Sequence, residues 1–192
     1  MNDVILRDVT ESDAARLIEI YSYYVENTAV SFEYDTPSEA EFRERIRETL
    51  KKYPYICIEV GGRIRGYACA GPFKGRAAYD WSVETTVYVE HGYEGSGYGR
   101  ILYDALEKRL KEMGILNLYA CIAVPKTEDE YLTKNSALFH ERMGFVKVGE
   151  FHNCGYKFGR WYDMIWMEKI SGKHSSVPEK VKWPEEDKLS EK

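Results

Sequence analysis

A glycine-rich segment is the first feature of this sequence whose residue types and spacing could do chemistry. Residues 92–100 read Gly-Tyr-Glu-Gly-Ser-Gly-Tyr-Gly-Arg and lie between a strand-like run and a helical pattern. The first N–H groups of a helix have no intrahelical partner and bind anions, and glycine lets a phosphate approach without interference from a Cβ. The segment therefore predicts a phosphate-binding loop, to which Arg100 could add a charge-assisted contact; a purely structural turn is the alternative.

The residues around the loop narrow the class of phosphate ligand. A nucleoside triphosphate loop would end in Gly-Lys-Ser/Thr, whereas this one ends in Gly99-Arg100-Ile101. A dinucleotide fold would place an acidic residue near the end of the next strand, but residues 117–122 contain none. The pyrophosphate of coenzyme A is the remaining candidate.

Metal chemistry is not indicated by the ligand-type residues. His91, His152 and Cys154 do not have the spacing of a ligand set, so we predict no metal. The cysteines contain no C-x-x-C pair, and most lie in apolar, strand-like stretches. Buried, reduced thiols are therefore expected, with a disulfide or metal role as a distant alternative; these are Cys57, Cys69, Cys121 and Cys154.

The elements that must position the loop can be read from periodicity and capping signals. Two helices are expected behind Thr10–Asp13 and Thr36–Glu39, the second with Thr36 as N-cap, Pro37 at its first position and Glu39 closing the box. Gly61-Gly62 suits a tight hairpin. Strands are expected at 4–7, 55–60, 64–70, 79–90, 117–123, 145–151 and 161–168, and two further helices at 101–113 and 136–143, ended by Gly114 and Gly144. This order predicts an α/β protein with a mixed sheet and flanking helices.

Bulk properties limit the other possibilities. The 192 residues carry a formal net charge of −5 and no basic block, which argues against a nucleic-acid partner. No apolar run is long enough to span a bilayer and no signal segment is recognised, so we expect no membrane partner and a cytoplasmic location. Residues 1–170 are expected to form one domain, and residues 171–192 a polar tail, mobile or loosely docked, with Trp183 as its one anchor.

Four segments of the sequence carry a resemblance to a known family: Ile20–Glu33, Ala70–Phe73, Arg76–Val89 and Phe139–Phe145. In this order they resemble the GNAT superfamily of N-acetyltransferases. The similarity is greatest to the branch of phosphinothricin, methionine sulfoximine and related amino-acid N-acetyltransferases, and it extends over roughly residues 3 to 170. The resemblance implies the GNAT fold, with a mixed, mostly antiparallel central sheet.

The resemblance also implies how the cofactor, acetyl-CoA, is held. The strand end Val87-Tyr88-Val89 would offer main-chain hydrogen bonds to the pantetheine arm, and the loop would hold the pyrophosphate. Glu94 departs from the family pattern, which has Gln or Arg there, and is unfavourable beside a pyrophosphate unless it faces solvent. The implied cofactor residues are Val87, Tyr88, Val89, Gly95, Ser96, Gly97, Tyr98, Gly99, Arg100, Asn135 and Ser136, with Thr133 competing for the role of Asn135.

Transfer to an amine requires the neutral amine, so a base is expected. Glu84 is the candidate, alone or through water, and its alternative role is a polar position on a half-buried strand. The N–H of Val87 or Tyr88 would stabilise the oxyanion. His140 matches a family histidine and is either a proton relay or a packing residue; Tyr98 and Tyr103 could also protonate the thiolate.

The acceptor is expected to be a small amino-acid-like amine, acetylated by direct transfer in a ternary complex. A carboxylate or phosphinate pairs well with a guanidinium. The alternatives are acetylation of a protein or peptide, which needs an open groove, and a catalytically silent CoA-binding sensor. The resemblance further suggests a homodimer. The expected substrate residues are Phe32, Glu33, Arg76, Tyr79 and Trp81, where core packing is the rival role of Phe32 and Trp81.

Overall fold

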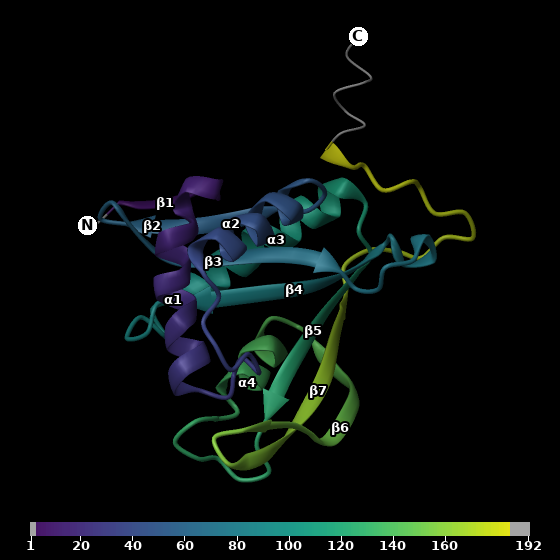
Figure 1. Ribbon diagram of the computed structural model, residues 1–192. Coiled ribbons are helices and arrows are strands. Elements are labelled where there is room, and N and C mark those ends of the chain that lie inside the picture. Colours follow the sequence, from purple (N-terminus) through teal and green to yellow (C-terminus); the bar gives the residue numbers. More distant parts are fainter. Residues whose placement is uncertain (1–2, 185–192) are drawn as a thin grey trace.

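Seven strands form one sheet in the computed structural model, which describes residues 3–184 (Figure 1). The strand order is β1-β2-β3-β4-β5-β7-β6, and every neighbouring pair is antiparallel except β4 and β5. The expected element order and the mixed, mostly antiparallel sheet are confirmed. The strands are β1 (Val4–Asp8), β2 (Tyr55–Val60), β3 (Arg63–Pro72), β4 (Ser82–Val89), β5 (Asn117–Val124), β6 (Val146–Lys157) and β7 (Arg160–Ile170); the helices are α1 (Ala14–Asn27), α2 (Glu39–Leu50), α3 (Tyr98–Met113) and α4 (Asn135–Arg142).

Capping boxes start the first two helical segments, one where expected and one displaced. The Thr10 N–H donates to Asp13 at 2.8 Å, but this box opens a single 3-10 turn that runs into α1. The expected N-cap at Thr36 is wrong by two residues, because its hydroxyl donates to a carboxylate on α1. Ser38 caps α2 instead, with Glu41 accepting from the Ser38 N–H at 2.7 Å.

The strand expected at 79–90 is shorter than its β-branched composition suggests. Residues Ala77–Tyr79 form a 3-10 turn, in which the Tyr79 N–H donates to the Arg76 carbonyl at 2.9 Å, and β4 begins only at Ser82. The loop before β4 is therefore longer than predicted. Its side chains are available to line a site at the edge of the sheet.

Two hydrophobic clusters sandwich the sheet, as the alternation along β2 requires. Ile56 and Ile58 face α3 and join a cluster with Leu102 and Leu106, while Tyr55 and Cys57 face α1 and α2. Figure 1 shows α1 and α2 on one side of β2 and β3 and α3 on the other. This arrangement fixes the sides of β4: odd-numbered residues such as Val83 and Thr85 face α3, and Glu84 faces the α1 side.

The parallel pair β4 and β5 stays together for only three residue pairs. Ser82, Val83 and Glu84 pair with Asn117, Leu118 and Tyr119, after which the two strands diverge (Figure 1). Within the described residues, the remainder of β4 pairs with β3 alone. The backbone of residues 85–88 is therefore open on the side that faces β5, while the Val89 carbonyl accepts from the Tyr24 hydroxyl.

Cysteine burial differs from the expectation for two of the four thiols. All four are free, Cys57 is buried and Cys69 is half-buried, but Cys121 and Cys154 are exposed. Cys121 lies on the open face of β5, and Cys154 lies in an irregular stretch of the edge strand β6. Strand-like, apolar surroundings therefore predicted the strand of Cys121 but not its exposure, and Cys154 lies in a part of β6 beyond the strand expected at 145–151.

The segment after Ile170 makes specific contacts as far as it is described. The Trp81 indole donates to the Glu179 carbonyl at 2.7 Å, Val181 is buried in the α3-side cluster, and Trp183 packs edge-on against Tyr53. The rest of the expected tail, residues 185–192, lies outside the described residues. Among residues 3–184, none of the helices is both long and apolar enough to cross a membrane.

Candidate active site

The end of β4 can bind a ligand only through its main chain, because its side chains are engaged in packing. Val87 packs into the α3-side cluster, whereas Tyr88 lies on the opposite face against the rings of Tyr21, Tyr24 and Tyr67. Burial raises the pKa of Tyr88 well above its ordinary value, so its hydroxyl stays neutral. What remains is the open strand edge created where β5 diverges.

The glycine-rich loop has the backbone conformation that its composition predicts. Gly92, Gly95 and Gly97 have φ values of +87°, +80° and +88°, which L side chains rarely adopt. Gly97 is the N-cap of α3 and has no side-chain cap, and the Ser96 hydroxyl donates backwards to the Tyr93 carbonyl. The first N–H groups of α3 are therefore available to an anion.

The two charged residues of the loop have opposite roles. The Glu94 carboxylate accepts from the Gly92 N–H at 2.7 Å and lies 3.1 Å from His91 Nδ1, so it is held at the start of the loop, half-exposed to solvent. Arg100 is exposed, and its Nε lies 3.8 Å from the Asp104 carboxylate, which is a long ion pair. Its guanidinium is free to move to a phosphate.

Helix α4 lies beside the start of α3. A Cβ built on Gly99 would lie 3.4 Å from the Phe139 ring, so α4 approaches the loop closely. Asn135 opens α4 and its N–H donates to the Thr133 hydroxyl at 3.4 Å, while the Ser136 carbonyl accepts from His140. Thus Asn135 and Ser136 are both at the exposed start of α4, but nothing in these contacts favours one over the other as a cofactor ligand.

Glu84 lies at the point where β4 and β5 separate. It faces Gly71 on β3 and Tyr119 on β5, and it has no hydrogen-bond partner among the described residues. Burial raises the pKa of the Glu84 carboxyl, and the charge of Lys74 opposes this rise. An unpartnered carboxylate with a raised pKa can accept a proton from an incoming ammonium.

An aromatic wall with a cation lies next to Glu84. Phe73 stacks on Tyr119 with ring centroids 4.1 Å apart and meets Trp166 edge-on at 5.4 Å. The Lys74 ammonium lies 5.2 Å from the centroid of Phe73 and 5.7 Å from that of Trp166. Sequence reasoning missed Lys74, although its position two residues before Arg76, directly after Gly-Pro-Phe, was a usable signal.

A cavity of about 570 Å³ lies between the end of α2 and the loop that joins β3 to β4. The predicted substrate residues Arg76 and Tyr79 line it, together with Lys74 and with Gly71, which lies opposite Glu84. Trp81 does not join them, because its ring packs against the α3-side cluster on the other face of β4. Two of the predicted residues are therefore grouped with a cation that was not predicted.

The segment 28–34 lies farther along the same sheet face. Ala29 packs with Ala123, which shares a face of β5 with Cys121 and Tyr119. The four-residue step from Tyr119 to Ala123 spans about 13 Å of strand. Phe32 lies over Gly155 in β6, and Glu33 pairs with Arg45 at 2.7 Å. The exposed Cys121 lies between this segment and Glu84.

His140 is buried and constrained. Its Nδ1–H donates to the Ser136 carbonyl at 2.8 Å, and the ring meets Tyr103, Phe139 and Phe145 edge-on. Burial lowers the pKa of His140, which keeps it neutral at pH 7. These contacts support packing more directly than proton transfer.

Tyr103 is equally constrained by its neighbours. Its hydroxyl bonds to Thr85, whose own hydroxyl donates to the Tyr119 carbonyl at 3.0 Å, and its pKa is raised by burial. The hydroxyl proton of Tyr103 is therefore engaged in a hydrogen bond to Thr85 inside the core. Tyr98 is half-buried with its ring stacked on Tyr93, and no contact assigns it a proton.

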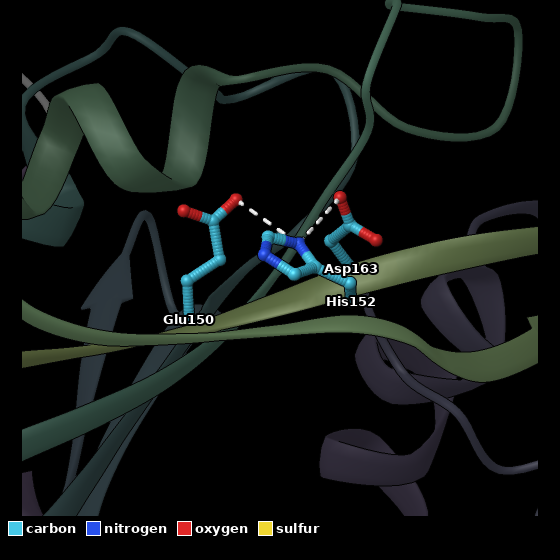
Figure 2. A group of neighbouring side chains, drawn as sticks. All are labelled: Glu150, His152 and Asp163. Carbon is cyan, nitrogen blue, oxygen red and sulfur yellow. Dashed lines mark ion pairs between the residues drawn. The ribbon is translucent and has the colours of Figure 1, made fainter.

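A group of metal-type ligands lies away from these sites, on β6 and β7. Figure 2 shows the His152 imidazole between the Glu150 and Asp163 carboxylates, with Nδ1 3.8 Å and 3.6 Å from them. Asp163 also accepts from the Asn153 N–H at 2.7 Å, which gives this buried carboxylate a structural role. The spacing of these residues in the sequence did not suggest the group, and the absence of a metal stays a prediction.

The divergent parallel strands, the uncapped glycine loop and the carboxylate beside them define an acyltransferase of the GNAT class. The family model described as "Acetyltransferase (GNAT) domain" matches residues 6–166, so the chain belongs to the GNAT acetyltransferase family. Acetyl-CoA is the acetyl donor of this family.

Relatives within the family are named for amino-acid-like substrates. The phosphinothricin N-acetyltransferase of Streptomyces viridochromogenes is 34% identical, over 83% of each chain. The L-methionine sulfoximine/L-methionine sulfone acetyltransferase of Salmonella typhimurium is 28% identical, over 89% of this chain and 96% of that one. The crystal structure of a phosphinothricin acetyltransferase from Sinorhizobium meliloti in complex with AcCoA matches with a TM-score of 0.84 and 30% identity, over 94% of this chain and 96% of that one.

Proposed function

We propose that this enzyme acetylates the α-amine of a small, anionic amino acid, such as phosphinothricin, methionine sulfoximine or sulfone, or a related L-amino acid. The observation that carries the proposal is the half-buried Glu84, whose pKa is raised and whose partner on β3, Gly71, lines a cavity with the cations Lys74 and Arg76. The names of the relatives support the same substrate class.

Acetyl-CoA binds along the open edge of β4 in this proposal. Main-chain groups of Val87–Val89 receive the pantetheine arm, and the first N–H groups of α3, with Arg100, receive the pyrophosphate. The start of α4, at Asn135 and Ser136, closes the other side. This placement brings the thioester to the β4–β5 divergence, where Glu84 lies.

Transfer follows in a ternary complex. Glu84, directly or through one water, takes a proton from the ammonium, and the neutral amine attacks the thioester carbon. The N–H of Val87, which does not bond to β3 in the observed register, stabilises the oxyanion. The oxyanion then collapses to the amide and expels the thiolate of CoA, which takes up the proton that the nitrogen loses. Lys74 and Arg76 bind the acceptor's carboxylate, and Tyr79 lines the same cavity. Phe32 and Glu33 bound the far end of the sheet face that carries Glu84.

An amine panel tests the substrate class. Acetyl-CoA consumption is measured with L-amino acids, their phosphinic and sulfone analogues, decarboxylated amines of the same side chain, and short peptides. We expect turnover of the carboxylate-bearing amines and loss of turnover with the decarboxylated ones. Preference for peptides would replace the proposal with peptide acetylation, and CoA binding without any turnover would indicate a sensor.

We also propose a homodimer that works in the cytoplasm. The edge strand β6 and the start of β7 expose several apolar side chains, which a second copy could cover: Val146, Val148, Phe151, Tyr156 and Trp161. Four free cysteines suit a reducing compartment. Sedimentation equilibrium tests the dimer, and a monomer at micromolar concentration would contradict it.

A further inference from the structure

Lys157, the last residue of β6, is buried, with only 2% of its surface exposed. Its ammonium donates to three backbone carbonyls: Val25 at 2.7 Å, Thr28 at 2.9 Å and Ser31 at 2.7 Å. An ammonium has three N–H donors, so its hydrogen-bonding capacity is filled by one short stretch of chain. Removing a charge from water is costly unless such partners replace the solvent. The hydrogen bonds therefore hold the Lys157 side chain and the backbone of residues 25–31 in fixed positions relative to each other.

The three carbonyls belong to the end of α1 and to the segment 28–34. The last carbonyls of a helix lack intrahelical partners and lie at the negative end of its dipole, where a cation is stabilising. Val25 is in the last turn of α1, while Thr28 and Ser31 are beyond it. One side chain therefore ends the helix and sets the path of the segment that follows.

Phe32, the next residue after Ser31, has a closely defined position. A Cβ built on Gly155 would lie 2.2 Å from the Phe32 ring, so the ring lies directly on the β6 backbone two residues before Lys157. The Tyr34 hydroxyl bonds to the Tyr156 carbonyl, and the Ala29 N–H donates to Tyr131 at 3.0 Å. The end of the β6–β7 hairpin, together with Tyr131 in the loop between β5 and α4, thus supports the segment.

We propose that Lys157 is a positioning residue for acceptor recognition: by fixing the segment 28–34 it holds Phe32 and Glu33 at the far end of the sheet face that carries Glu84. The inference rests on the proposed function, because it concerns the same acceptor site. It predicts a larger change in acceptor binding than in acetyl-CoA binding, because all three hydrogen bonds of the Lys157 ammonium go to residues 25–31 and none goes to the glycine loop of residues 92–97.

The test compares Lys157→Met with Lys147→Met. Lys147 is an exposed lysine of the same strand that pairs with Glu150, so its variant controls for loss of a lysine in β6. We expect Lys157→Met to raise the acceptor KM by about tenfold or more, the scale of lost charge-assisted hydrogen bonds, and the acetyl-CoA KM by no more than about twofold. Lys147→Met should resemble the wild type in both constants.

Hydrogen exchange supplies a readout that does not depend on turnover. In Lys157→Met the Ala29, Val30 and Glu33 amides, which have protein acceptors in the wild type, should exchange faster, while amides of β2 and β3 do not change. Unchanged exchange in the segment, or equal increases of both KM values, would overturn the proposal. Should Lys157→Met be insoluble, Lys157→Gln must show the same pattern.

The proposal and the function beneath it can fail separately. If the wild-type enzyme acetylates no amino acid but Lys157→Met loosens the segment, the substrate assignment fails and the ordering role stands. If the wild type acetylates amino acids and a loosened segment leaves the acceptor KM unchanged, the positioning role fails and the function stands.

Discussion

The cofactor side and the acceptor side of this molecule are built in different ways. On the cofactor side, the groups proposed to bind are mainly main-chain N–H and C=O groups of residues 87–99, with the side chains of Val87 and Tyr88 turned into the two hydrophobic clusters. On the acceptor side, the groups are side chains brought together from separate segments: Phe32, Phe73, Lys74, Arg76 and Glu84.

This difference predicts how each side responds to mutation. Main-chain recognition tolerates side-chain changes unless they disturb the backbone, so the cofactor side should be sensitive at its glycines. Side-chain recognition depends on charge and proton affinity, so the acceptor side should be sensitive to substitutions that leave the backbone intact. The experiments below test this contrast, beginning with the largest effect.

Glu84→Gln should produce the largest loss. It keeps the shape of the side chain but removes the base, so kcat/KM should fall by about 10²–10⁴-fold. CoA affinity should be retained, because the cofactor uses main-chain groups farther along β4. The loss should shrink as pH rises toward the pKa of the acceptor amine, since solvent then supplies the neutral nucleophile.

The matched control for this variant is Glu168→Gln, a half-buried carboxylate on β7 that lies opposite Tyr119. It should stay close to the wild type. A Glu84→Gln enzyme with near-normal activity at pH 7 would remove Glu84 from the mechanism, and equal loss at every pH together with weaker CoA binding would make it a packing residue.

Lys74→Ala should affect the acceptor in two ways. Loss of the cation should raise the KM of a carboxylate-bearing amine by about tenfold, as for a lost charge-assisted hydrogen bond. Lys74 also lowers the pKa of Glu84, so its removal should raise that pKa and move the acid limb of the kcat/KM profile to higher pH.

Arg76→Ala separates the two cations. It should raise the acceptor KM to a similar degree, but no effect of Arg76 on the Glu84 pKa is expected and the acid limb should stay in place. Equal shifts of the acid limb in the Lys74 and Arg76 variants would show that this limb does not reflect the titration of Glu84.

Gly97→Ala tests the backbone of the cofactor side. The φ of +88° costs an L residue about 1 kcal/mol, so the variant should lose stability or weaken CoA about fivefold, with the acceptor KM unchanged. Gly149→Ala is the control, because that glycine has no positive φ and open space around it. Equal effects of the two substitutions would contradict a special backbone role for Gly97.

His140→Phe should have the smallest effect on activity, keeping kcat/KM within about threefold if the ring only packs. Burial lowers the folded-state pKa of His140 below the unfolded value of about 6.5, so its contribution favours folding above that pH and is lost as the pH falls. The phenylalanine variant should therefore unfold less readily in acid, as measured by urea denaturation at pH 5 and 7. A loss of activity of 100-fold or more would instead support a proton relay.

The same contrast explains what the sequence could predict. The glycine loop, the α3 start and most strands depend on neighbours in the sequence, and they were predicted within a few residues. The α2 cap was not, because Thr36-x-x-Glu39 and Ser38-x-x-Glu41 both fit a capping box, and a contact from Thr36 to α1 decides between them.

The acceptor side depends on contacts between residues far apart in the sequence. Lys157 bonds to Val25, 132 residues away, and nothing near either residue indicates the pairing. Trp81 was expected at the substrate, yet its ring packs against the α3-side cluster and its indole donates to the distant Glu179 carbonyl. Segment order and several candidate side chains, such as Glu84 and Arg76, could be read from the sequence, but contacts between distant segments, such as those of Lys157, could not.

Initial-rate kinetics with product identification test the central claim most directly, namely direct acetyl transfer to an amino-acid amine. The purified enzyme is assayed with varied acetyl-CoA at several fixed concentrations of the best acceptor from the panel, and the product is identified by mass spectrometry. A ternary complex predicts intersecting double-reciprocal lines and an N-acetylated amino acid. Parallel lines with an acetylated protein would instead indicate a covalent intermediate, and CoA binding without any acetylated amine would contradict the account altogether.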